Sequence, residues 1–422
     1  MALYRILALD GGGSWALIQV KALIDIYGPE TRGLEVLGEF DLAAANSGGS
    51  LTLGGLIENL QLADILRYFE DAMLRASVFH RNGSLARWFS DLTSIRFGPI
   101  YSTSQKLAGI EALMPNAGGR QMTALAQYVV DTLRATGHPE VTSSPDFVIC
   151  AFDYDRLRET FFRSNPQSSA ASGAPNLNPT LAEAIHASSN APIFFFDAPA
   201  QLVGHRYWDG AVGGYNNPVL AAVAEAVANG TPLGTIRVLS LGTANVFLPM
   251  ASGAAGEDSN LVKPAEATGE FHDIKELATA IVDDPPDAAS FLAYLMLGGR
   301  TPGPRDPIPL TEVPIVRMNP LIQPVRSDEA EAWRAPSGLS SADIAALAAL
   351  DMDATADADV ARIAALADNW IDPPPVLTPS PDPAPHPVRN QPIRANSATL
   401  ECEIGHWTYA EAKAAWQRFR PP

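Results

Sequence analysis

The feature that most constrains this chain is a run of three glycines placed directly after a short apolar segment. Leu3–Leu9 reads as a buried strand that stops at Asp10-Gly11-Gly12-Gly13. Trp15–Ile26 then lacks glycine and proline and ends before Gly28, which predicts a helix with a defined stop. In a strand–loop–helix unit of this kind, successive backbone N–H groups can point at one spot at the helix N-terminus. The loop is therefore predicted to bind either the oxyanion of an acyl-transfer reaction or a phosphate.

A second strand–turn–helix unit carries a serine. Phe40–Ala45 is predicted as an apolar strand, and it is broken at Asn46-Ser47-Gly48-Gly49 before another helix. A sharp turn between strand and helix lifts a serine hydroxyl out of the sheet, and its flanking residues must be small. Ala45 stands where glycine is usual, so the pattern is A-x-S-x-G. Taken alone, the segment is equally compatible with an ordinary small-residue turn capped by Ser47.

The third segment is Trp208-Asp209-Gly210-Ala211, in which an aspartate follows an apolar stretch and precedes a glycine. Such an aspartate can simply form a turn. It can also serve as a general base for Ser47. A free aspartate with a pKa near 3.9 is a poor base, but desolvation at an apolar site raises that pKa.

Together these segments identify a family resemblance. The order D-G-G-G, a serine elbow about 37 residues later, and D-G-A far downstream resembles the patatin-like phospholipases. The segment Ala187-Ser188-Ser189-Asn190-Ala191-Pro192, followed by Phe194, is similar to the family's A-S-x-A-x-P segment. Ser240-Leu241-Gly242-Thr243 is similar to its S-L-G-T strand end. The resemblance extends over about residues 3–372.

The resemblance implies a three-layer α/β/α fold around a mostly parallel sheet and a Ser–Asp dyad without a catalytic histidine or a cofactor. It implies these roles: Ser47 as nucleophile, Asp209 as base, and Gly11, Gly12, Gly13 and the Gly48 N–H around the oxyanion. Two departures stand out. Ala45 replaces the elbow glycine, and Ser14-Trp15-Ala16 replaces the usual x-Arg/Lys-Gly, which removes one cation near the oxyanion loop.

The wider pattern agrees with this fold class. Further strands are predicted at Phe147–Phe152 and Ile236–Leu241. Strands alternating with helices favour a mostly parallel sheet covered on both faces. One predicted helix carries a core-facing stripe with helical spacing, made of Leu62, Ile65, Leu66, Phe69 and Met73.

We expect a hydrolase domain over residues 1–372 with an excursion or lid at 245–310, a proline-rich linker at 373–388 and a tail at 389–422. Within the excursion, the apolar patch Phe291–Leu297 either lines an acyl-chain entry, which we favour, or fills a satellite core. The tail helix begins at a capping box. It is expected to dock on the body, with membrane contact as the alternative.

Charge limits the partners. A net charge of −18 and a pI near 4.7 argue against nucleic acid, so a lipid or ester substrate is the expected partner. A transient contact with a membrane surface would have to be apolar or locally basic. Cys150 and Cys402 are too few for a disulfide framework, and neither a membrane span nor a signal peptide is predicted, which fits a cytoplasmic location. The oligomeric state is left open.

Other interpretations carry less weight. His186 and His205 are candidates for a Ser-His-Asp triad, and a structural role is expected for both. Asp351, Asp353, Asp357 and Asp359 superficially resemble a calcium loop, but the central glycine and terminal glutamate are missing, so no metal site is predicted.

Two other functions remain as alternatives. An actin- or sugar-kinase-like ATPase would use the triple glycine and Asp209–Gly214 as phosphate loops, with a hairpin where a helix is predicted here. A non-catalytic lipid-binding relative is suggested only by Ser14-Trp15-Ala16.

Overall fold

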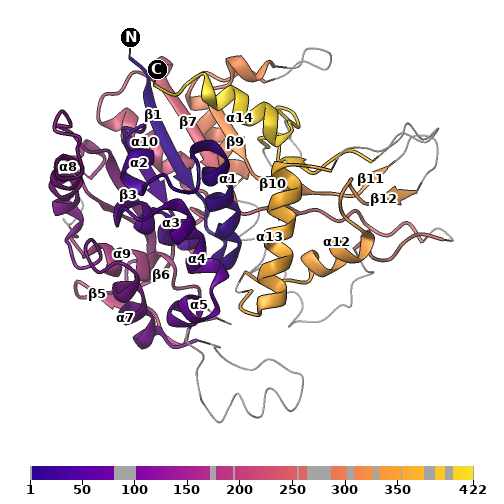
Figure 1. Ribbon diagram of the computed structural model, residues 1–422, viewed down its shortest axis with the longest axis horizontal. Coiled ribbons are helices and arrows are strands. Elements are labelled where there is room, and N and C mark those ends of the chain that lie inside the picture. The colour runs from indigo at the N-terminus through magenta and orange to yellow at the C-terminus, as the bar shows by residue number, and fades with distance from the viewer. Residues whose placement is uncertain are drawn as a thin grey trace.

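The computed structural model describes residues 2–79, 101–171, 177–192, 195–253, 256–263, 287–301, 308–326, 332–352, 354–374, 385–394 and 403–421. Over these residues the chain is a mixed α/β protein (Figure 1). Within the described ranges, every helix is too short or too polar to cross a bilayer.

An eight-stranded sheet forms the centre of the molecule. Its order is β5-β6-β3-β2-β1-β7-β9, with β4 paired to β3. The strands are β1 Tyr4–Leu9, β2 Leu42–Ala45, β3 Asp146–Asp153, β4 Arg158–Arg163, β5 Ala200–Leu202, β6 His205–Asp209, β7 Ile236–Leu241 and β9 Ile315–Met318. Strands β1, β2, β3, β7 and β9 run parallel to one another, while β4, β5 and β6 are antiparallel additions. The predicted mostly parallel sheet is confirmed.

Alternation along β1 shows why the second part of this strand is a continuous apolar run. Leu7 and Leu9 face one hydrophobic cluster, whereas Ile6 and Ala8 face the other. Because helices cover both sides, residues 6–9 of β1 and all of β2 are buried, and the usual apolar–polar alternation is absent there. This two-sided burial is the reason that a plain apolar run was the right signal for the strands.

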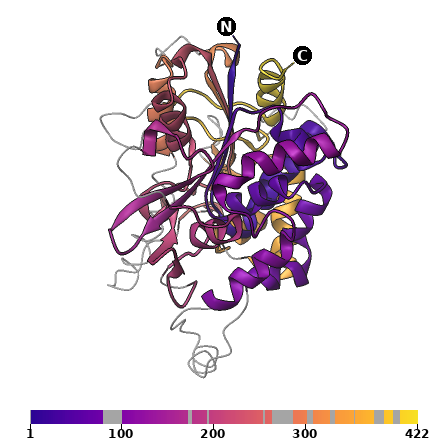
Figure 2. The ribbon, with the colours of Figure 1, turned by 90° about the vertical axis from the view of Figure 1, so that its left-hand side faces the viewer.

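The sheet separates two helical layers. In Figure 2 it is seen nearly edge-on, with the indigo and purple helices on one side and α10 and residues 287–296 on the other. The first layer contains α1 Leu17–Tyr27, α2 Gly33–Leu37, α3 Ser47–Ile57, α4 Leu62–Glu70, α5 Ala72–Val78, α7 Thr103–Leu113, α8 Leu125–Ala135, α9 Leu181–Ser188 and α13 Asp357–Ile371. The second contains α10 Val219–Ala228. The expected three-layer α/β/α arrangement is confirmed.

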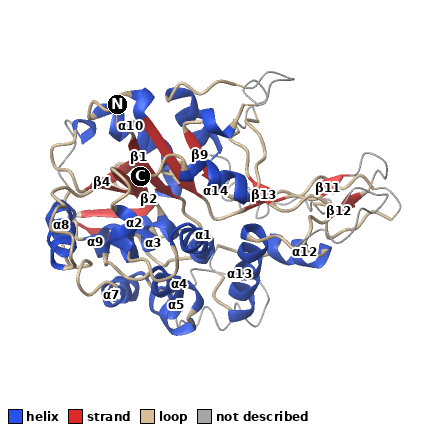
Figure 3. Cartoon of the chain, turned by 45° about the horizontal axis from the view of Figure 1, so that its top comes forward, coloured by secondary structure: helices blue, strands red, loops and turns tan. Residues whose placement is uncertain are grey.

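Shorter elements complete the described chain. The 3-10 turns are η1 Gly13–Ala16, η2 Met122–Ala124, η3 Ser169–Ala171, η4 Gly210–Gly213, η5 Leu233–Thr235 and η6 Leu310–Glu312, and the last helices are α12 Ser341–Ala348 and α14 Tyr409–Gln417. A small sheet joins β8 Asn245–Val246, β10 Pro320–Ile322 and β13 Arg389–Asn390. Figure 3 shows the hairpin of β11 Val325–Arg326 and β12 Trp333–Arg334 at the end of an arm that projects from the main sheet.

The predicted apolar stripe from Leu62 to Met73 is wrong at its end. Helix α4 stops at Glu70, and α5 begins at Ala72 because the Asp71 carboxylate accepts hydrogen bonds from the Met73 and Leu74 amides. Because α5 is a separate helix, Met73 does not continue the buried face of α4, and this residue is 83% exposed.

The apolar patch at Phe291–Leu297 does not line an acyl-chain entry. Phe291, Tyr294 and Leu297 are spaced three residues apart and pack in the cluster on the α10 side of the sheet. Leu292, Leu295 and Met296 are partly exposed. This correction has a simple cause: the segment covers the sheet face opposite the layer that contains α3 and Ser47.

The tail helix α14 docks on the body, as expected. Trp416 is fully buried and stacks on Phe40 with ring centroids 5.5 Å apart, and the Lys413 ammonium lies 2.7 Å from the Asp25 carboxylate. Trp370 of α13 meets Tyr409 edge to face at 4.6 Å. In Figure 1 the orange α13 accordingly lies beside the indigo α1.

Candidate active site

Sheet register brings the serine and the aspartate together. Strand β2 pairs with the first half of β3, where Ala45 lies opposite Ile149. Strand β6 pairs with the second half of β3, where Asp209 lies opposite Ala151. Because β4 occupies the other edge of β3 along both halves, β2 and β6 share one edge and meet with their carboxyl ends facing. This end-to-end approach places the residues after Ala45 next to Asp209.

Ser47 sits at the turn between β2 and α3 in a strained backbone conformation. Its φ is +48°, in the left-handed region that residues other than glycine rarely adopt. The Ser47 amide donates to Ser188 Oγ at 3.0 Å, and the Ser50 hydroxyl donates to the Ser47 carbonyl oxygen at 2.5 Å. Ala45 does not disturb the turn, because its methyl group is buried in the core cluster of the first layer.

Asp209 is buried, and polar groups surround its carboxylate. Oδ1 accepts hydrogen bonds from Asn46 Nδ2 and from the Ala211 amide, each at 2.9 Å. Burial raises the pKa of Asp209, while hydrogen bonds from the Ala211 amide, the Ser47 hydroxyl and the Asn46 amide oppose the rise. A carboxylate with a raised pKa beside a serine hydroxyl has the chemistry of a general base.

The A-S-x-A-x-P segment holds the backbones of Ser47 and Asp209. Ser188 Oγ, which accepts from the Ser47 amide, donates to Asn46 Oδ1 at 3.3 Å. The Asp209 amide donates to the Asn190 carbonyl oxygen at 3.0 Å. One short segment at the end of α9 therefore holds both backbones, and the Asn46 amide links Ser188 to the Asp209 carboxylate.

The glycines of the first loop do not all have the same role. The Gly11 amide already donates to the Asn216 carbonyl oxygen at 2.8 Å, so it is committed within the loop. Gly13 and Gly48 line the pocket beside Ser47, and Gly12 and Gly13 have φ values of +154° and +56°. A Cβ at Gly48 would lie 2.4 Å from the Gly13 carbonyl oxygen, so the close approach of these two segments requires glycine.

Polar side chains hold the loop of residues 10–13 in place. Gln19 donates to the carbonyl oxygens of Asp10 and Leu241 at 2.8 and 3.0 Å. The Asp10 carboxylate forms an ion pair with Arg317 of β9 at 2.5 Å, and both side chains are buried. At the end of β7, the Thr243 hydroxyl donates to the Gly11 carbonyl oxygen at 2.7 Å.

Residues 14–16 have a structural role where the family carries a cation. The Ser14 amide donates to the Met352 carbonyl oxygen at 3.0 Å, and Trp15 Nε1 donates to the Asp351 carbonyl oxygen at 3.3 Å. These bonds fix Met352 against the pocket. Ser14 and Trp15, which depart from the family pattern, therefore hold Met352 in place. This residue of the pocket lining comes from the C-terminal third of the chain.

The pocket beside Ser47 is small, mostly apolar and open to solvent, with a cavity volume of about 20 Å³. It is lined by Gly13, Ser47, Gly48, Leu51, Val78, Phe79, Lys106, Ser189, Ala191, Phe195, Phe196 and Met352. Among these described lining residues, Lys106 alone carries a charge.

Sequence reasoning missed three polar residues of this region. Asn46 links the Asp209 carboxylate to Ser188, and Lys106 lies in the pocket wall. The third is Glu159 of β4, whose two carboxyl oxygens are buried without a hydrogen-bond partner in the described structure. Burial, with the Asp209 charge adding to it, raises the pKa of Glu159 to about 10. Only the strand pairing reveals Glu159, because it approaches Asp209 from the opposite edge of β3.

The two candidate histidines lie apart from this dyad. Burial, together with the neighbouring Lys106 charge, lowers the pKa of His186 to about 3, which keeps its imidazole neutral. His205 begins β6 and faces Asp153, with its Nδ1 at 3.6 Å from Asp153 Oδ2. Neither imidazole has a hydrogen bond to Ser47 within the described chain.

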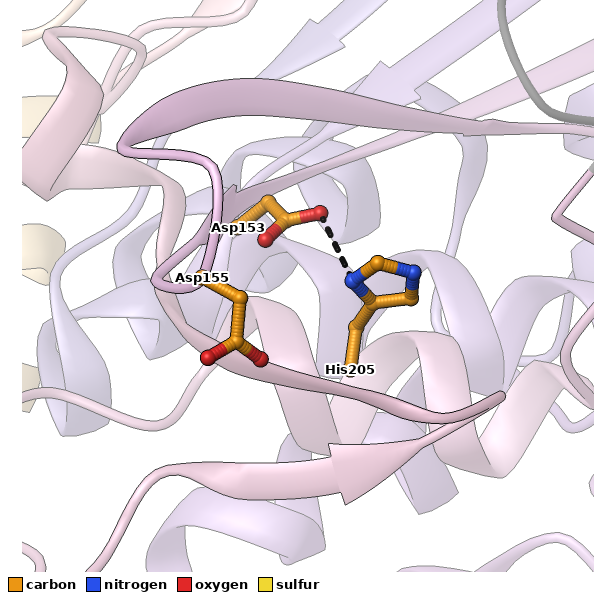
Figure 4. A group of neighbouring side chains, drawn as sticks. All are labelled: Asp153, Asp155 and His205. Carbon is orange, nitrogen blue, oxygen red and sulfur yellow. Dashed lines mark ion pairs between the residues drawn. The ribbon is translucent and has the colours of Figure 1, made fainter.

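One group of side chains has the composition of a metal site. Asp153, Asp155 and His205 lie close together at the β3–β4 turn (Figure 4). Arginines already occupy both carboxylates: Arg206 Nε donates to Asp155 at 2.8 Å, and Arg156 Nε lies 3.7 Å from Asp153. Two guanidinium groups oppose a cation here, so the cluster does not fit a metal.

The acids that resembled a calcium loop also have other partners. Asp357 begins α13 and pairs with the buried Arg75. Asp359 pairs with Arg362 at 3.2 Å, while Asp353 lies outside the described residues. These contacts agree with their interpretation as acids at a helix N-terminus.

The fold and the site define an α/β protein with a serine at a strand-to-helix turn, an adjacent buried aspartate and a glycine loop. The chain belongs to the patatin-like phospholipase family, whose model matches residues 7–223, about half of the 422 residues. The family is one of lipid acyl hydrolases, which makes the chain a member of a hydrolase family.

The chain is similar to a protein of Bacillus subtilis and to a solved structure from Legionella pneumophila. A Bacillus subtilis (strain 168) protein, CotR, whose name describes it as a sporulation hydrolase, is 27% identical over 246 residues. That match covers 58% of this chain and 63% of CotR, so it spans less than two thirds of that relative. The crystal structure of VipD from Legionella pneumophila matches with 10% identity and a TM-score of 0.35, covering 87% of this chain and 67% of that one.

Topology contradicts the kinase-like alternative. That fold requires a hairpin around its first phosphate loop. Here the loop is followed by η1 and α1, and β1 pairs with β2 and β7, both in parallel.

Proposed function

We propose that the protein is a serine hydrolase that cleaves carboxylic esters of lipids through an acyl-enzyme on Ser47. Phospholipids and lysophospholipids are included among these esters. The observation that carries the proposal is Ser47 in the lining of the apolar pocket, with the buried Asp209 carboxylate held by Asn46, the residue next to Ser47. The family membership supports the same reaction class.

The first half of the reaction forms the acyl-enzyme. Ser47 Oγ attacks the ester carbonyl carbon, and its proton passes to Asp209. The developing oxyanion is stabilised by backbone amides, and we assign this role to Gly12, Gly13 and Gly48, since the Gly11 amide is committed to Asn216. Collapse of the tetrahedral intermediate breaks the ester C–O bond, and the departing alkoxide takes the proton from Asp209.

The second half restores the enzyme. Water attacks the acyl-enzyme carbonyl carbon while Asp209 accepts its proton, and that proton returns to Ser47 as the acid product leaves. Asp209 acts in both halves, so its charge must be available at neutral pH. The hydrogen bonds from Ala211 and Asn46 oppose the rise of the Asp209 pKa and so favour its charged form.

Mutation of the dyad tests the assignment. We expect Ser47→Ala and Asp209→Asn each to lower kcat/KM for an ester substrate by at least about a hundredfold. Ser77→Ala, a serine outside the pocket lining, serves as the matched control and should leave kcat/KM unchanged. A smaller loss for either dyad variant, with its fold intact, contradicts the role assigned to that residue.

Covalent labelling separates an enzyme from a lipid-binding relative. A fluorophosphonate should form an adduct on Ser47 in the folded wild-type protein, and mass spectrometry of peptides should locate it there. Folded protein that binds lipid and remains unlabelled at Ser47 would instead be a non-catalytic binder.

A further inference from the structure

Lys106 is a fully buried lysine with few polar partners. Its side chain on α7 is fully buried, and in the described structure its ammonium has one hydrogen-bond acceptor, the His186 carbonyl oxygen at 3.3 Å. The Phe196 ring lies 4.2 Å away from the ammonium, face on. A lysine ammonium carries three N–H donors, so this environment leaves it under-compensated.

The position of Lys106 connects it to the candidate reaction. It lines the same pocket as Ser47, and its pKa, which burial holds well below the usual value, is raised in part by the Asp209 charge. The wall around it is formed mainly by aliphatic and aromatic side chains, including Leu51, Val78 and Phe196. The pocket thus combines the serines Ser47 and Ser189, an apolar wall and one lysine.

A purely structural role explains only part of this arrangement. The bond to the His186 carbonyl places the ammonium at the C-terminal end of α9, where a cation is favoured. That bond uses one donor, and the remaining two face an environment with no carboxylate among the described lining residues. A ligand that brings its own negative charge would compensate the ammonium.

We propose that Lys106 binds an anionic group, a phosphate or a carboxylate, that is attached to the ester substrate. This inference rests on the proposed function and names the substrate class of that site. The apolar chain of the ester would occupy the wall formed by residues such as Leu51 and Val78, with the carbonyl at Ser47 and the anion at Lys106. Charge-assisted hydrogen bonds to the ammonium then distinguish an anionic ester from a neutral one with the same chain.

Binding to a catalytically inactive protein tests the proposal without turnover. The probes are octanoyl lysophosphatidate and octanoyl glycerol, which share the acyl chain and glycerol and differ in the phosphate. In the Ser47→Ala background we expect tighter binding of the phosphate-bearing probe by calorimetry. Adding Lys106→Met should reduce the ratio of the two affinities at least tenfold, whereas Lys413→Met, a matched change far along the chain, should leave it unaltered.

Further variants keep the test decisive. Lys106→Gln retains a donor for the His186 carbonyl without the charge, so it should lose the preference even if the methionine variant unfolds. Lys106→Arg should retain it. Equal loss of affinity for both probes in a folded neutral variant would overturn the proposal and assign Lys106 a structural role.

A free anion must be distinguished from a substrate group. Inorganic phosphate should bind at least tenfold more weakly than octanoyl lysophosphatidate, because it makes no apolar contacts. Equal affinity would identify a site for free phosphate and overturn the proposal. Absence of both hydrolysis and Ser47 labelling in the wild type would end the proposed function, while the binding ratios in the Ser47→Ala background would still stand by themselves.

Discussion

At the scale of single residues, the site is defined by how buried charges are compensated. Asp209 is surrounded by donors from Asn46, Ala211 and Ser47, whereas Glu159 behind it has none in the described structure. Burial raises the pKa of both carboxyl groups, to about 10 for Glu159, but hydrogen bonds oppose the rise only at Asp209. This difference leads to two predictions.

Asn46→Ala removes a donor that stabilises the charged form of Asp209. The pKa of Asp209 should rise further above its ordinary value, because the opposing hydrogen bond is lost. We expect the acid limb of the kcat/KM profile to move to higher pH, with a larger activity loss at pH 5 than at pH 8. Asn178→Ala is the control, because the Asn178 side-chain amide donates to Thr123 Oγ1 and not to Asp209. An acid limb that stays in place would show that Asn46 does not tune the base.

Glu159→Gln should stabilise the protein in a pH-dependent way. Below the ordinary pKa of 4.5 the carboxyl is protonated in the folded and unfolded chains alike, and it adds no pH dependence. Between 4.5 and about 10 only the unfolded chain ionises, so the wild-type free energy of unfolding falls as pH rises through this window. Glutamine cannot ionise.

The free energy of unfolding of Glu159→Gln, relative to wild type, should therefore grow between about pH 5 and pH 9. Urea denaturation at several pH values measures it, and Glu140→Gln, at an exposed position, should show no such trend. A difference that is flat with pH would mean that Glu159 is ionised in the folded protein.

At the scale of elements, the site depends on close contact between two strand–turn–helix units. The first turn of α3 packs against the glycine loop, with Gly48 over Gly13 and Gly49 over the carbonyl oxygens of Leu9 and Asp10. These contacts are backbone to backbone, so a methyl group cannot be accommodated by a rotamer change. The short side chains of the motif therefore serve packing as well as chemistry.

Gly48→Ala tests this contact. Its Cβ would meet the Gly13 carbonyl oxygen at 2.4 Å, so the two units must separate. We expect a stability loss of about 1–3 kcal/mol, together with a fall in kcat that exceeds any change in KM. Gly119→Ala has open space at its Cβ and is the matched control. Unchanged stability and kcat would show that the glycine loop can move away from the added methyl group at little cost in free energy.

At the scale of the whole molecule, the C-terminal segments complete the first helical layer. Helices α13 and α14 pack on α1 and the core cluster, and Met352 just before α13 closes one side of the pocket. The tail is thus joined to the hydrolase core through aromatic contacts between Phe40, Trp416, Trp370 and Tyr409.

Trp416→Ala measures how strongly the tail is coupled to the body. Removing a fully buried indole that stacks on Phe40 should cost about 3–5 kcal/mol of stability. Chemical denaturation followed by circular dichroism provides the measurement, and Arg418→Ala, at an exposed neighbour, should change it by less than about 0.5 kcal/mol. A loss below about 1 kcal/mol for the tryptophan variant would contradict tight docking.

The sequence by itself determined the local units. Leu3–Leu9 and Phe40–Ala45 could be recognised as strands because two-sided burial makes most of their residues apolar, and the glycine runs after them marked the turns. Ser47 and Asp209 could be named because their short motifs carry family-specific spacing. The end of α4 at Asp71 and the burial of Phe291 could not be predicted, because both depend on which face each helix presents to the sheet.

Only the tertiary structure decided how these units meet. The facing ends of β2 and β6 arise from long-range pairing with β3, Ala45 with Ile149 and Asp209 with Ala151, and no local pattern encodes that register. The same pairing brings Glu159 behind Asp209, while α7 carries Lys106 into the pocket. Local propensity sets the elements, but long-range packing sets the environment of each charge, and that environment fixes its protonation and its chemistry.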